Sequence, residues 1–255
     1  MELIYVNFVI ALLSSLTIVL GGIVEGYGYG LSLGTNWPYT KNMLRLALKG
    51  DPEVFHRIIA TVIGILASIS LILDFSILNL LGFLSLIVTA ILGMAVLYVL
   101  SGKLPPFIQG VHDVFAYSTF LIYLFLSFNL NLNSFINFLS SNVPLFFFYL
   151  TIFLGGTVSG ARRMKERVGL FIVPKSRLQF FWFLHGVSTL LFLFILAFYI
   201  PSYLTTFLLL IAEIAMGGLT YFRLERNPVR PGFVVALHQI LSIGVVTSIS
   251  IHLLM

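Results

Sequence analysis

The residues of this sequence best suited to chemistry are its histidines, of which there are five. Four of them stand at or near the start of an apolar run: His56, His112, His185 and His238. Histidine binds transition metals and heme iron through its imidazole nitrogens. The sequence has no cysteine, which excludes disulfides, thiolate ligands, iron–sulfur clusters and covalent heme attachment. Any metal would therefore be held by histidine, methionine or oxygen.

The elements that must position these histidines are membrane-spanning helices. Hydrophobic residues make up 59% of the 255 residues and charged residues only 9%, against about 25% charged residues in soluble domains. A soluble fold is therefore excluded. Nucleic acid is no partner either, because no arginine-rich soluble domain accompanies the net charge of +5. We expect about eight spanning helices, at approximately 3–24, 54–76, 77–100, 109–130, 143–160, 178–200, 202–222 and 232–255.

An internal repeat relates the two halves of the chain. Residues 17–26 read TIVLGGIVEG and residues 151–160 read TIFLGGTVSG, which are identical at seven of ten positions. Because each unit contains an even number of spans, both copies enter the membrane with the same orientation. The sequence therefore predicts an all-α integral membrane protein built as two tandem four-helix bundles in parallel repeat, with its halves at 1–140 and 141–255.

This repeat places the four histidines near one membrane face, within about two helical turns of the same surface. All fourteen Lys and Arg residues lie in or beside the connections at that face. A heme iron with two axial imidazoles needs a histidine from each of two facing helices, an apolar slot and cations near its propionates. We expect His56 with His112 to form one such pair and His185 with His238 the other. The cations of this face, Arg57 among them, would meet the propionates.

Zinc fits this histidine pattern less well than heme. The histidines form no H-x-x-x-H or H-E-x-x-H helix face, and no carboxylate cluster completes a tetrahedral shell. Two other ionisable residues stand apart from the four. Glu213, near the middle of a span, is either a proton-handling group or a protonated hydrogen bonder between helices. His252 lies near the opposite face without a repeat partner, and we interpret it as structural or incidental.

The two halves differ in the charged groups beside their histidines. Glu53 precedes His56 by three residues and Arg57 by four, so one helix face holds all three and Glu53 can pair with Arg57. Asp113 follows His112 directly, and the second half has no matching carboxylates. Acid–base chemistry is therefore expected in the first half. The alternative is that Glu53 is simply a carboxylate at a helix start, where the helix dipole favours it.

These features together resemble the heme A synthase family, membrane enzymes that oxidise heme O to heme A for a-type cytochrome oxidases. The resemblance spans essentially the whole chain. It rests on EVFHR at 53–57, which matches the family's E-x-x-H-R, on the three later histidines, on the duplicated Leu-Gly-Gly segments and on GTNWP at 34–38. Many members carry a cysteine pair flanking that Trp-Pro loop. This chain lacks the pair and is similar to a cysteine-free branch.

The resemblance implies a role for each histidine pair. His185 and His238 would hold a heme b prosthetic group, whereas His56 and His112 would receive the substrate heme O, with Glu53 required for turnover. The C8 methyl of heme O would be oxidised to the formyl group of the product heme A, for cytochrome oxidase assembly. The implied partners are membrane lipid, a heme O synthase and an electron donor.

The orientation in the membrane is predicted differently by two arguments. The resemblance implies a multi-pass protein of the cell membrane with the histidine face outside the cytoplasm. The bias of Lys and Arg toward cytoplasmic loops predicts the opposite, because every basic residue is on the histidine side. A cofactor with two carboxylates gives these cations another reason to be there, so we follow the resemblance.

Three other functions are compatible with the residues. A di-heme b-type membrane cytochrome for quinone-linked electron transfer would use the same four ligands without needing Glu53. A heme carrier or exporter would bind the macrocycle transiently. A transporter whose histidines serve only packing would bind no heme.

Overall fold

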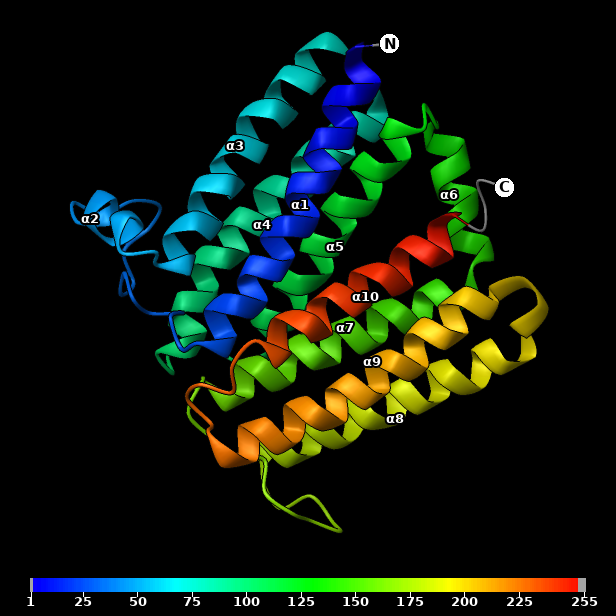
Figure 1. Cartoon of the computed structure of the whole chain (residues 1–255). Helices are drawn as coiled ribbons and strands as arrows, with labels where there is room; N and C mark the ends of the chain where they lie inside the picture. The colour runs from blue at the N-terminus through cyan, green and yellow to red at the C-terminus, as the bar shows by residue number, and fades with distance from the viewer. Residues whose placement is uncertain (1, 252–255) are drawn as a thin grey trace.

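The computed structural model describes residues 2–251, with side chains from residue 3 onward. Every regular element in this range is an α-helix, and there are ten of them (Figure 1). Their bounds are α1 Glu2–Gly26, α2 Met43–Leu48, α3 Pro52–Leu73, α4 Ile77–Leu100, α5 Phe107–Ser127, α6 Leu132–Ser141, α7 Val143–Arg162, α8 Arg177–Phe198, α9 Ile200–Arg226 and α10 Val234–Ile251.

Eight of these helices are long and apolar enough to cross a membrane, namely all except α2 and α6. They coincide with the eight predicted runs, so the prediction of an all-helical, multi-pass membrane protein is confirmed. The helix bounds differ from the runs by a few residues because capping groups decide where a helix begins. The run predicted at 54–76, for example, begins at Pro52, where the Asp51 side chain accepts a 2.9 Å hydrogen bond from the Glu53 backbone N–H.

The sequence reading did not include the two short helices, α2 and α6. Helix α6 begins after Asn131, whose side chain accepts a 3.0 Å hydrogen bond from the backbone N–H of Ser134. Its Phe135 and Phe138 are buried, and their rings lie 5.3 and 4.8 Å from the ring of Phe125 in α5. Ten residues with one apolar side are too short to span a bilayer. A search for long apolar runs therefore overlooks such a helix.

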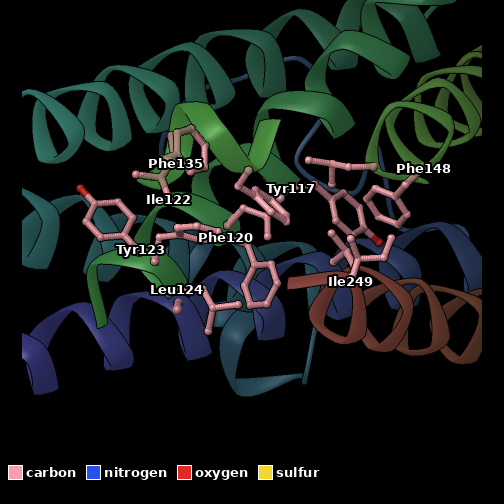
Figure 2. Close-up of a cluster of buried hydrophobic side chains, with 14 of the residues drawn as sticks. Tyr117, Phe120, Ile122, Tyr123, Leu124, Phe135, Phe148 and Ile249 are labelled. Carbon is pink, nitrogen blue, oxygen red and sulfur yellow. The ribbon is translucent and has the colours of Figure 1, made fainter. Parts of the chain in front are cut away.

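Packing in the described part of the chain centres on α5, which contacts α1, α4 and α7. Its Tyr117, Phe120 and Tyr123 belong to the largest buried apolar cluster, which also includes Phe148 of α7 and Ile249 of α10 (Figure 2). The two predicted halves meet where α5 contacts α7 and where α1 contacts α10. The division of the chain into halves at 1–140 and 141–255 stays a prediction.

Two glycines allow the halves to approach closely. A Cβ atom built on Gly22 of α1 would lie 2.9 Å from the Cα of Ala236 in α10. One built on Gly156 of α7 would lie 2.8 Å from the Cα of Gly110 in α5. No side chain fits at either distance, so these helix contacts require glycine.

The connections between spans gather at two opposite ends of the helices (Figure 1). The end with the longer exposed loops holds the connections 27–51, 101–106, 163–176 and 227–233, and these contain or adjoin the basic residues. The described connections at the other end contain no Lys or Arg. The four histidines lie within the first nine residues of α3, α5, α8 and α10. They are therefore close to the basic end.

Candidate functional site

Three of the four histidines are held by the backbone of the preceding spanning helix. The Nδ1 of His56 lies 3.0 Å from a carbonyl oxygen of α1, that of His112 lies 3.0 Å from one of α4, and that of His185 lies 3.1 Å from one of α7. The acceptors are the backbone oxygens of Thr17, Thr89 and Thr151, in that order. Because a carbonyl can only accept, Nδ1 donates and Nε2 keeps its lone pair free.

A glycine four residues after each carbonyl makes room for the imidazole. A Cβ built on Gly21 would lie 3.7 Å from the Cε1 of its histidine, while Cβ atoms on Gly93 and Gly155 would lie 3.3 and 3.1 Å from theirs. A helical side chain covers the turn that precedes its own Cα. A Cβ at position 93 or 155 would therefore crowd the histidine ring beside its carbonyl, whereas one at position 21 would make an ordinary contact.

The fourth histidine has the same surroundings with one change. A Cβ built on Gly217 of α9 would lie 3.4 Å from the Cε1 of His238. The residue four positions earlier is Glu213, where the other three helices have threonine. The Nδ1 of His238 lies 3.2 Å from the Oε1 of Glu213. All four sites therefore pair a histidine with the preceding helix at a matched position.

Sequence reasoning missed this fourfold pattern, although a signal for it exists. The segment Thr-x-x-x-Gly occurs at 17–21, 89–93 and 151–155, one spanning helix before a histidine each time. Glu-x-x-x-Gly occupies the fourth place, at 213–217. Aligning the spanning helix that precedes each histidine would have revealed this repeated segment.

The two histidines of each predicted half interact electrostatically, and their pairing as ligands stays a prediction. His112 lies within electrostatic range of His56, and His185 lies within electrostatic range of His238. All four rings are only partly covered by protein. Among the described side chains, no three His, Asp or Glu residues gather as ligands of a single metal ion.

Glu53 is buried one turn before His56, and both of its carboxylate oxygens have partners. Oε1 accepts a 2.5 Å hydrogen bond from the guanidinium of Arg57, which forms the ion pair expected from the spacing. Oε2 accepts bonds of 2.9 and 2.8 Å from the backbone N–H and the hydroxyl of Ser32. Arg57 also donates to the carbonyl oxygens of Asn36 and Pro38, at 2.7 and 3.1 Å. The carboxylate and the guanidinium therefore hold the first connection against α3.

A polar cluster lies between the two histidine pairs, where the predicted halves meet. Asp113, next to His112, accepts a 3.2 Å hydrogen bond from Gln109. One turn further along α5, the hydroxyl of Tyr117 donates a 3.0 Å bond to Gln239, the neighbour of His238. The residue after each of these histidines thus faces the interface between the halves.

A second contact between the halves is ionic. Arg162 at the end of α7 is only 1% exposed, and its guanidinium lies 3.2 Å from the Oε1 of Glu25 in α1. The same guanidinium donates a 2.6 Å hydrogen bond to the carbonyl of Pro228. Arg162 therefore ties α7, α1 and the connection 227–233 together at the histidine end.

Two features lie apart from the histidines. An apolar cavity of about 470 Å³ opens between α4, α5, α6 and α7, and none of the four histidines lines it. His252, interpreted from the sequence as structural or incidental, lies outside the described residues.

The residues present fit a heme with two axial imidazoles. His56, His112 and His185 each offer a free Nε2 from a ring that a bond at Nδ1 orients, and the ring of His238 faces the carboxylate of Glu213. Partners at Nδ1 are how proteins hold ligating imidazoles. Comparison of the chain with models of known families, with curated proteins and with solved structures gives no match in any of the three. Function is therefore inferred from the geometry of the site.

Proposed function

We propose that this protein is a membrane oxidoreductase of the heme A synthase type, which oxidises the C8 methyl of heme O to a formyl group. The observation that supports it most is the fourfold arrangement of histidines. In each of the three sites with threonine, Nδ1 is occupied by a carbonyl and Nε2 is free. Together with His238, which faces Glu213, these three imidazoles make two pairs, the number that two hemes would need.

In this proposal the C-terminal pair, His185 and His238, holds heme b, and the N-terminal pair, His56 and His112, receives heme O. Heme b supplies electron transfer when it is bound. The chain contributes the four imidazoles, three of them oriented by backbone carbonyls, and the apolar spanning helices around them. The membrane is that of the cell, and a heme O synthase and an electron donor are the proposed partners.

Glu53 is the proposed proton-handling group of the substrate site. It is 4% exposed and lies one helical turn from His56, on the same face of α3. Its hydrogen bonds to Ser32 and Arg57 fix the carboxylate in place. A buried carboxylate held next to a reacting group can accept or deliver a proton without rearranging.

The test of heme ligation is the heme content of the purified protein. We expect pyridine-hemochrome analysis and mass spectrometry to find heme b in the wild type and to find that His185→Ala loses it. His56→Ala should keep heme b and form no heme A. A colourless wild-type protein would overturn the proposal in favour of a transporter.

The test of Glu53 separates proton handling from loop anchoring. Glu53→Gln should lower the rate of heme A formation by about 100-fold or more, the usual contribution of general acid–base catalysis. Ser32→Ala removes a contact with the same carboxylate and leaves the carboxylate in place, so it should cost less than about tenfold. Equal losses in the two variants would show that Glu53 only anchors the loop.

A second function, that of a di-heme b-type cytochrome, is favoured by one observation. Both oxygens of Glu53 are engaged by Ser32 and Arg57, which is what a purely structural carboxylate would show. An electron-transfer protein with the same four ligands needs no proton-handling group there. Quinol-driven heme reduction without any modified heme product would establish this alternative.

A further inference from the structure

The four histidine sites are alike except for the group that faces Nδ1. In three of them the residue four positions before the glycine is threonine, and only its backbone carbonyl meets the ring. In the fourth that residue is Glu213, and its side chain also reaches the ring of His238. The C-terminal pair therefore joins one carbonyl-backed histidine, His185, to one carboxylate-backed histidine.

The carboxylate of Glu213 is deeply placed in the helix bundle. The residue is 8% exposed, and its Oε1 lies 3.2 Å from the Nδ1 of His238. Among the described residues, neither its Oε2 nor the Nδ1 of His238 has a well-aligned hydrogen-bond partner, so the 3.2 Å contact between the two side chains is an ionic approach. A buried polar atom without a hydrogen-bond partner lowers the stability of the fold. Each group is therefore the natural partner of the other.

A carboxylate and a carbonyl act differently on a ligating imidazole. A carboxylate that accepts the Nδ1–H draws the proton more strongly and makes the free Nε2 a better electron donor. A more strongly donating axial ligand stabilises ferric over ferrous heme, which lowers the reduction potential. The carbonyl at the other three sites has a weaker effect of the same kind.

We propose that Glu213 is a positioning residue that backs His238 and makes the C-terminal heme the lower-potential of the two. The inference rests on the proposed heme ligation by His238. It also sets the direction of electron transfer between the two hemes, because the heme of lower potential donates to the heme of higher potential. The N-terminal pair, with carbonyl partners only, would then be the acceptor.

The experiment is a redox titration of the purified heme-loaded protein, followed by visible absorption. Glu213→Thr recreates the other three sites, and Glu213→Gln keeps the size and loses the charge. We expect each to raise the potential of the C-terminal heme by about 59 mV or more, which corresponds to a tenfold change in the reduction equilibrium. The potential of the other heme should stay unchanged.

The matched control is Thr151→Val, at the equivalent position facing the other ligand of the same heme. Because His185 uses the backbone oxygen of Thr151, this change should leave the potential where it was. If Glu213→Thr fails to fold, Glu213→Gln supplies the measurement. Unchanged potentials in a folded Glu213 variant would overturn the inference.

The outcomes separate the inference from the proposed function. A raised potential in a protein that makes no heme A would keep the role of Glu213 and remove the heme A synthase activity. An unchanged potential in a protein that does make heme A would remove only the role of Glu213. A wild-type protein without heme would remove both.

Discussion

At the scale of single residues, each histidine ring is oriented beside a glycine of the preceding helix, where a side chain would compete for the same space. The glycine opposite the ring leaves a different amount of room at each site. A methyl group at position 155 would lie 3.1 Å from the Cε1 of His185, which is tight, whereas one at position 21 would lie 3.7 Å from that of His56, an ordinary contact. The sites should therefore respond differently to the same substitution.

We predict that Gly155→Ala weakens heme binding by the C-terminal pair by about 1 kcal/mol or more, because the methyl overpacks against His185. Gly21→Ala should leave heme binding by its own pair unchanged. The heme bound per protein, measured by pyridine hemochrome after purification, distinguishes them. Equal heme content in the two variants would contradict this account of the glycines.

The histidines could be predicted from their residue type, but for their partners the sequence offers only the repeated spacing of Thr-x-x-x-Gly and Glu-x-x-x-Gly. Histidine is rare in an apolar chain and stands out by type, and the Glu53–Arg57 pair follows from its helical spacing. The acceptors at Thr17 and its equivalents are backbone atoms, which every residue type has. The contact of Glu53 with Ser32 joins residues 21 positions apart, across the connection that contains α2. No periodic pattern reports such a contact.

At the scale of helices, close packing between α5 and α7 depends on Gly156. A side chain there would meet the Cα of Gly110 and the carboxylate of Asp113. We predict that Gly156→Val destabilises the protein by about 1–3 kcal/mol, the usual cost of overpacking. Thermal unfolding in detergent, followed by circular dichroism, measures the effect.

The control is Gly186→Val in α8, where a built Cβ has nothing within 4 Å. This variant should unfold at nearly the wild-type temperature. A comparable loss of stability at position 186 would mean that valine itself disturbs these helices, and the contact between α5 and α7 would then need another explanation.

The spanning helices are the elements that sequence predicts best, since a bilayer requires about 20 apolar residues in a row. Helix α9 is long and apolar enough to be recognised as a span even though it contains the buried carboxylate of Glu213. Helix α6 escapes prediction because its reason to form is tertiary, namely the contact of Phe135 and Phe138 with Phe125. Such contacts are visible only once α5 is in place.

At the scale of the whole molecule, the open question is which end faces the cytoplasm. The chain has no cysteine, so an introduced one is a unique label. Lys165 is exposed in the connection between α7 and α8 at the basic end, and Ser140 is exposed at the other end. We predict that an impermeant maleimide labels Lys165→Cys, and not Ser140→Cys, from outside intact cells.

The opposite labelling would place the histidine end in the cytoplasm, as the distribution of Lys and Arg predicts. Detergent-permeabilised cells serve as the control, because both thiols should react there. Cleavage of the exposed connection 163–176 by an added protease gives an independent measurement of the same orientation.

The bonds from histidine Nδ1 to backbone carbonyls have an evolutionary consequence. A carbonyl oxygen is present whatever the side chain, so mutation at Thr17, Thr89 or Thr151 leaves the acceptor intact. At these three positions the contact with the ring therefore places no demand on the side chain, and it depends on the histidine and the glycine. At Glu213 the acceptor is a side chain that one substitution removes. Without selection for the carboxylate, random substitution would therefore remove the partner of His238 before it removed those of the other three histidines.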